Sequence, residues 1–317
     1  MISDDMQKKD NLTISNKGIK QDSSIVLWII FFALTAVTLW AYWPVMMDLI
    51  DEWQSNDDYS AGQLVPITAL FLILKERRKL KESTLSPFWP GIVLLFLAQA
   101  ARLYGLLFMF ESAERYSLVL MIAGLILTVA GLDVFKRTFW IIMFLFLMVP
   151  FPGQIHNLIS GPLQRIATSG SVFLLEAFGA NVSQQGNVVS LNRGTTMAVE
   201  EACSGLRMLT AFIIVTYFVA YVVKRSRFQK AFLVCSSVPI AVMCNIIRLC
   251  ITAVLFMLVS SQAAEKFFHD FAGITMMPAA VILIFGELWI LKLLTTTEST
   301  KEEIIISSKS LTSNNKK

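Results

Sequence analysis

Long apolar blocks separated by short polar segments run through most of this 317-residue chain. Most blocks approach the roughly 20 residues that an α-helix needs to cross about 30 Å of hydrocarbon. The pattern predicts eight membrane-spanning helices, at about 25–47, 61–74, 88–110, 116–132, 138–151, 205–223, 231–259 and 271–291. A transmembrane β-barrel would instead show shorter, alternating segments. The expected fold class is therefore an all-α integral membrane protein.

The polar segments divide the chain further. Residues 1–24 are predicted to form a disordered cytoplasmic tail, residues 25–291 one membrane domain, and residues 292–317 a second cytoplasmic polar tail. Within the long polar region 153–202, residues 155–178 are expected to form an amphipathic helix along the interface, and residues 181–198 to include a short hairpin. The apolar face of that helix would carry Ile155, Leu158, Ile159, Leu163 and Ile166.

Composition supports the membrane prediction. Hydrophobic residues make up 55% of the chain and charged residues only 16%, with a mean hydropathy of +0.63. A soluble domain carries about 25% charged residues. The net charge of +4 is spread over short loops and tails. A chain with so little soluble mass is not expected to bind nucleic acid.

The positions of Lys and Arg predict the topology. They lie in the N-terminal tail, a basic loop at 75–81, a link at 133–137, a loop at 224–230 and the C-terminal tail. The alternating links are poor in these residues; the link 48–58 has five acids and no Lys or Arg, and a short link covers 111–115. Under the positive-inside rule, both termini are cytoplasmic and 153–202 is extracytoplasmic.

Cys203 is the first candidate for chemistry. It precedes the sixth predicted span, on the outer side, where the positive end of a helix dipole lowers a thiol pKa. Gly205 permits close backbone approach. The adjacent Glu200 and Glu201 oppose thiolate formation, so they are expected to serve geometry or substrate binding.

Two further residues, Arg248 and His269, are predicted at a similar depth, where a polar side chain is energetically costly to place in a membrane. Arg248 lies 17 residues into the seventh span, about 25 Å along it, and a charge inside a span indicates function. Asn245 lies on the same face, so the pair could clamp an oxyanion or a substrate carbonyl. Arg207 is the rival for that role. His269, beside Asp270, precedes the last span, and His156 is its rival as a base.

No metal or organic cofactor is expected. The four cysteines show no CxxC or Cys/His spacing typical of zinc. Cys235 and Cys244 are interpreted as packing residues. Cys250 could pair with Cys203, which would remove the nucleophile.

Three ordered segments resemble the signature blocks of the exosortase/archaeosortase family: Glu201-Ala202-Cys203-Ser204-Gly205-Leu206-Arg207, Asn245-Ile246-Ile247-Arg248 and His269-Asp270-Phe271-Ala272-Gly273. Residues 62–66 are also similar to that family, and the resemblance covers about 25–291. It implies a membrane cysteine transpeptidase in which Cys203, Arg248 and His269 are catalytic. It also implies that the neighbouring block residues support them or bind substrate: Glu201, Ser204, Gly205, Arg207, Asn245 and Asp270.

The expected substrates are exported proteins with a C-terminal sorting signal, made of a short motif, a transmembrane helix and a basic cluster. The enzyme would cleave this signal through a thioester and pass the product to water or to a lipid- or sugar-linked acceptor. The expected location is the bacterial inner membrane, amid its lipids, with the active site outside. A transporter lined by Arg248, Asn245 and Glu287, or a membrane acyltransferase, are the alternatives.

Overall fold

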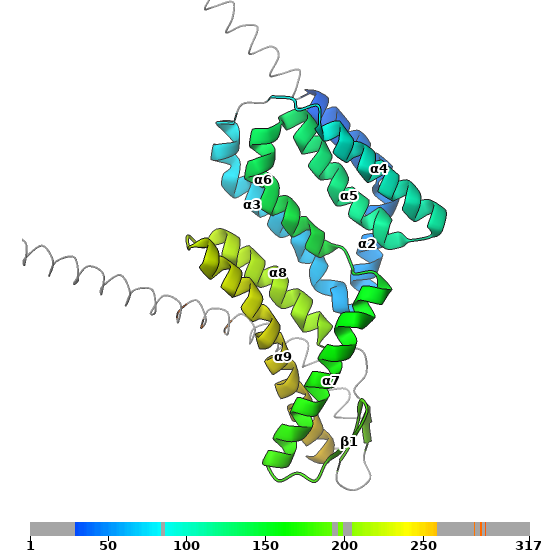
Figure 1. The fold of residues 1–317 in the computed structure, drawn as a ribbon, viewed down its shortest axis with the longest axis vertical. Coiled ribbons are helices and arrows are strands. Elements are labelled where there is room, and N and C mark those ends of the chain that lie inside the picture. Colours follow the sequence, from blue (N-terminus) through cyan, green and yellow to red (C-terminus); the bar gives the residue numbers. More distant parts are fainter. Residues whose placement is uncertain are drawn as a thin grey trace, which may run out of the picture. The chain divides into compact units, whose positions relative to one another are not determined.

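The computed structural model describes residues 29–83, 86–191, 196–198 and 205–258, with single residues 282, 286 and 289. The chain divides into two compact units, Met1–Pro152 and Gly153–Lys317 (Figure 1). The boundary lies between Pro152 and the long helix that follows it. The seven described residues of the predicted signature blocks, 205–207 and 245–248, therefore belong to the second unit.

Helices form the first unit. They are Ile29–Ala41, α2 (Trp43–Ser55), the 3-10 helix η1 (Asp57–Gln63), α3 (Leu64–Lys81), α4 (Gly91–Phe108), α5 (Glu111–Leu125), the π-helical turn η2 (Ile126–Ala130), α6 (Leu132–Leu145) and the 3-10 turn η3 (Phe146–Met148). The first two are bent by 59° at Tyr42. Pro44 at the start of α2 has no N–H to donate, which favours the break. Arg102 Nη2 donates to the backbone carbonyl of Ala41, at the bend, at 2.7 Å.

Small residues bring α4 and α5 together. Gly91, Ala98 and Gly105 repeat every seven residues along the buried side of α4. A Cβ on Gly91 would meet Thr128, and one on Gly105 would meet Glu114, so the two helices pack antiparallel at very short range. The opposite side of α4 exposes large apolar side chains, namely Ile92, Val93, Phe96, Leu97, Leu103 and Leu107. An apolar outer surface of this kind suits contact with lipid.

Several predicted links in the first unit were wrong, because charged residues extend the helices. The basic run 75–81 forms the last turns of α3, where straight-chain residues favour helix and cations suit the negative end of the dipole. Glu111–Arg115 begins α5, and 133–137 begins α6, with acids in both first turns. The actual reversals use Met109 and Gly131, both with positive φ. Asp48, Asp51 and Glu52, predicted in a link, lie within α2.

The second unit combines α7 (Gly153–Ala177), strands β1 (Ser183–Gln185), β2 (Val188–Ser190) and β3 (Thr196–Ala198), α8 (Leu206–Val222) and α9 (Arg227–Leu258). The strands form an antiparallel sheet in the order β1-β2-β3, with Gln184 opposite Val189 and Val189 opposite Met197. The predicted hairpin is therefore confirmed, and Gly186 with φ +62° makes its first turn. Val182, Val189 and Leu191 pack in one core with residues of α7 and α9.

The predicted helix at 155–178 is confirmed as α7, but its apolar face is not the face that it buries. Ile155, Leu158 and Ile166 are exposed. The buried side instead carries mainly small and polar residues, namely Ser160, Gln164, Ala167, Thr168, Ser171, Val172 and Leu175. Polar side chains that face protein and apolar side chains that face outward are the arrangement expected next to lipid.

Length and composition identify three helices able to cross a membrane within the described part of the chain: Gly91–Phe108, Glu111–Ala130 and Arg227–Leu258. The number rises to five if each of two bent helix pairs counts as one span. These agree with the third, fourth and seventh predicted spans. α8 matches the sixth in position with 17 residues. The count of eight and the orientation of the termini stay predictions, and the last span, 271–291, lies almost wholly outside the described residues.

Candidate functional site

Four of the nine predicted site residues lie in the described part of the chain: Gly205, Arg207, Asn245 and Arg248. The others lie outside it, namely Glu201, Cys203, Ser204, His269 and Asp270. The rival transporter residue Glu287 also lies outside it. The structure therefore tests how the first two signature blocks meet, through the helices α8 and α9 that carry them.

The α8–α9 hairpin brings these blocks together. A short turn joins the helices, and Ser226 begins α9 as a capping box: Ser226 Oγ accepts from the Gln229 N–H at 3.3 Å, and Gln229 Oε1 accepts from the Ser226 N–H at 3.4 Å. The 17 residues of α8 span about 26 Å, and α9 covers about 27 Å from Arg227 to Asn245. Because the helices run in opposite directions (Figure 1), the start of α8 returns to the level of Asn245.

A direct contact between Gly205 and Asn245 confirms that the start of α8 lies at the level of Asn245. Gly205 caps the N-terminus of α8 with φ +85°. A Cβ built on Gly205 would lie 2.7 Å from Asn245 Nδ2 and 3.0 Å from Asn245 Cγ. The side-chain amide of Asn245 therefore occupies the space that a larger residue at 205 would need. Asn245 is only 1% exposed, so this contact is sealed within the second unit.

Arg248 lies one turn further along α9 than Asn245. Arg248 is buried, with 7% exposure. Thr252 Oγ1 donates to the backbone carbonyl of Arg248 at 2.8 Å. Asn245 and Arg248, three residues apart, thus share the buried face of α9 beside the start of α8. Arg207, in the first turn of α8, is half-buried.

α7 packs against α9 at the same depth. A Cβ on Gly170 would meet the Ile246 side chain, and Cys250 Sγ lies 3.7 Å from the carbonyl oxygen of Ser171. Ala167 and Leu249 share the buried core there. Cys250 is a free cysteine, and its possible partner Cys203 lies outside the described residues. Within the described residues, no group of His, Cys, Asp and Glu side chains could hold a metal ion.

His156, the rival of His269 as a base, lies near the start of α7. It lies 14 residues before Gly170 on α7, which corresponds to about 21 Å along the helix. Gly170 contacts Ile246, the residue next to Asn245. The choice between His156 and His269 as the base stays a prediction, because His269 lies outside the described residues. His269 is the only other histidine in the sequence.

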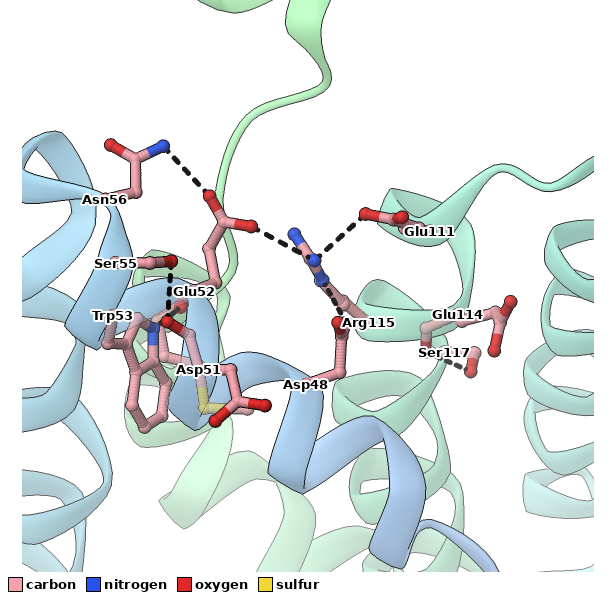
Figure 2. Close-up of polar contacts among 11 residues, drawn as sticks. Asp48, Asp51, Glu52, Trp53, Ser55, Asn56, Glu111, Glu114, Arg115 and Ser117 are labelled. Atoms are coloured by element: carbon pink, nitrogen blue, oxygen red, sulfur yellow. Dashed lines mark hydrogen bonds and ion pairs between the residues drawn. The ribbon is translucent and has the colours of Figure 1, made fainter.

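A second polar cluster, in the first unit, was not predicted. Arg115 is 5% exposed and is surrounded by carboxylates of α2 and α5 (Figure 2). Its Nε donates to Asp48 Oδ2 at 2.8 Å, and its Nη2 lies 3.0 Å from Glu111 Oε2 and 3.2 Å from Glu52 Oε2. Asn56 Nδ2 donates to the other oxygen of Glu52. The available signal was the excess of acids at 48–58, which required a buried cation nearby.

The fold and the buried Arg248 define a largely helical, multi-pass membrane protein with charged groups held inside its bundles. The family model described as transmembrane exosortase (Exosortase_EpsH) matches residues 53–286, well over half of the chain. The chain therefore belongs to the transmembrane exosortase family, which is associated with protein-sorting transpeptidase activity. Comparison with curated proteins and with solved structures gave no match.

Proposed function

We propose that this protein is a membrane cysteine transpeptidase that removes the C-terminal sorting signal of exported proteins. Cys203 is the nucleophile, His269 the proton shuttle and Arg248 the oxyanion-stabilising cation. The observation that carries the proposal is the contact between Gly205 and Asn245, since it joins two signature blocks that are 40 residues apart in the sequence. Membership of the exosortase family supports the same activity.

The chemistry follows acyl transfer. The Cys203 thiolate attacks the scissile carbonyl carbon, and a C–S bond forms as the carbonyl oxygen takes up negative charge. The buried guanidinium of Arg248 stabilises that charge, and it does so strongly because water is excluded around it. The C–N bond then breaks, and the leaving amine takes a proton from the His269 imidazolium. A thioester joins Cys203 to the substrate.

Release of the product reverses these roles. An acceptor amine or a water molecule gives a proton to His269 and attacks the thioester carbonyl, and Cys203 leaves as the thiolate. The acceptor belongs to a lipid- or sugar-linked carrier where transfer occurs. The substrate is held by its own C-terminal helix, so its cleavage motif lies at the extracytoplasmic face of the bacterial inner membrane. Glu201, Ser204 and Asp270 line the substrate path or orient the catalytic groups.

Intact-mass analysis of a co-expressed substrate tests the proposal. The substrate carries a short Pro-Glu-Pro motif, an apolar helix and a basic cluster, and it is expressed with wild type, Cys203→Ala or Cys235→Ala. Cys235 is an exposed free thiol, so its substitution is the matched control. We expect loss of the C-terminal helix with wild type and Cys235→Ala, and intact substrate with Cys203→Ala. Equal cleavage with Cys203→Ala would refute the cysteine mechanism.

A further inference from the structure

Asn245 occupies an unusual place for a polar residue. It lies in the middle of a 32-residue helix, almost fully buried, and its amide packs on the backbone of Gly205. Burial of a carboxamide is costly unless hydrogen bonds replace its contacts with water, so a packing role alone would favour an apolar residue. The size and shape of the Asn245 side chain instead fit the backbone of the neighbouring helix at Gly205, which gives a reason for an Asn at this position.

Gly205 shows why that point matters. Its φ of +85° is a conformation that L side chains rarely adopt, and its backbone carbonyl accepts the first helical bond of α8, from the Leu209 N–H at 2.9 Å. Gly205 therefore fixes the direction in which the chain enters α8. Cys203 lies two residues earlier in the sequence. A shift of the Gly205 backbone would move the start of α8 relative to the chain before it.

We propose that Asn245 is a positioning residue that locks Gly205 in this conformation and thereby fixes the direction in which the chain that carries Cys203 enters α8. The proposal rests on the proposed function, because it concerns the residue assigned as nucleophile. It differs from an oxyanion-clamp role, in which Asn245 would contact the substrate. Here Asn245 acts on the thiol through the protein backbone, and its effect exists before any substrate binds.

The consequence is measurable on the free enzyme. A thiol held at a helix N-terminus has a lowered pKa, and release from that position raises it. We expect Asn245→Ala to raise the apparent pKa of Cys203 by about one pH unit, which corresponds to about ten-fold slower alkylation near neutral pH. An oxyanion clamp would leave this pH profile unchanged, because alkylation involves no peptide substrate.

The experiment is alkylation of the detergent-solubilised enzyme with iodoacetamide across pH, with the Cys203 peptide quantified by mass spectrometry. Cys244, which is 6% exposed, is the internal control, since its labelling reports unfolding. Ser237→Ala is the matched variant: Ser237 is fully buried two turns earlier on α9, and its hydroxyl donates to the backbone carbonyl of Val234 in the same helix. It should leave the Cys203 profile unchanged. If Cys244 is labelled in Asn245→Ala, which would indicate unfolding, the measurement is made on Asn245→Ser, which changes the side chain less.

A double variant tests the contact itself. Gly205→Ala places a Cβ against the Asn245 amide and should slow alkylation; Asn245→Ala removes that amide, so the double variant should recover part of the loss. An unchanged pH profile in Asn245→Ala, or a double variant no better than Gly205→Ala, overturns the proposal. Neither result depends on substrate cleavage, so Cys203→Ala can still test the proposed function separately. Conversely, a shifted profile with cleavage by Cys203→Ala would keep the positioning role and remove the function.

Discussion

Substitution of Arg115 by methionine should destabilise the first unit more than removal of any one of its acidic partners. Methionine keeps most of the length of the side chain but removes the cation that Asp48, Glu52 and Glu111 share. Because Arg115 is the buried member of the cluster, all three ion pairs depend on it. Its loss leaves three acids close together without the charge that compensates them.

The solvent exposure of the partners sets the size of the effect. Removal of one member of a fully buried ion pair costs about 3–5 kcal/mol. Here the side chains of Asp48, Glu52 and Glu111 are 49%, 24% and 70% exposed, so water recovers part of their solvation. We expect Arg115→Met to lower the free energy of unfolding by about 2–3 kcal/mol and Asp48→Asn to lower it by about 1 kcal/mol. Glu111→Gln should lower it by at most about 0.5 kcal/mol, because Glu111 and Arg115 form an i,i+4 pair in which Glu111 is exposed.

Thermal unfolding in a mild detergent, followed by tryptophan fluorescence, measures this order. Arg115→Met should lower the midpoint by on the order of 5 °C. Lys79→Met is the control, because Lys79 and Glu76 form an equally short pair, at 2.8 Å, with the Lys79 side chain 65% exposed. It should change the midpoint little. A midpoint for Arg115→Met equal to that of Lys79→Met, or a Glu111→Gln effect as large as that of Asp48→Asn, would refute the reasoning.

Two further predictions concern the backbone and a buried phenol. Gly131→Ala should lower the free energy of unfolding by about 3 kcal/mol or more, because Gly131 has φ +88° and a Cβ there would overlap the backbone carbonyl of Ser86. Gly186→Ala should lower it by only about 1 kcal/mol, because Gly186 has φ +62° but open space around it. Equal unfolding midpoints for the two variants would contradict the packing argument. Burial raises the pKa of Tyr59 to about 12, with Asp58 and Glu52 adding to the rise and a backbone contact with Phe151 opposing it. The neutral phenol is favoured in the folded state, so its contribution to stability is present below pH 10 and is lost as the pH rises through about 12; ultraviolet titration and unfolding of wild type and Tyr59→Phe measure it, and Tyr59 ionisation near pH 10 would contradict it.

Hydropathy predicted the apolar helix cores well and their ends poorly. α4, α8 and α9 follow the predicted spans closely, because long apolar stretches make up most of their sequences. The ends of α3 and α5 were missed because Lys, Arg and Glu favour helix as well as solvent, so charge marks the membrane boundary but not the end of the helix. Met109 at the α4–α5 reversal gave no warning, since a non-glycine residue rarely has φ of +52°.

Contacts between distant segments could not be predicted in the same way. Arg115 meets acids from α2, 67 positions earlier, and periodicity carries no information on such a pairing. The protein-facing side of α7 was not predicted, because only the apolar stripe of this helix was described from the sequence, and it was placed along the membrane interface. Next to lipid, apolar Leu158 faces outward, while Thr168 and Ser171 satisfy their hydroxyls on the carbonyls of Gln164 and Thr168 and can be buried.

The contact between Gly205 and Asn245 is the part of the site that can be predicted by counting residues from the turn between α8 and α9. In an antiparallel hairpin with a short turn, the fixed rise of 1.5 Å per residue makes positions equally far from the turn lie at one level. Gly205 is 18 residues before Val223 and Asn245 is 19 after Ser226, so depth alone predicts their approach. The same count places Arg248 one turn beyond the start of α8, toward the chain that leads to Cys203. The approach of α7 at Gly170 to Ile246 cannot be counted in this way, because no short turn joins α7 to α9. Depth therefore selects the residues that can meet, and packing between helices decides which of them do.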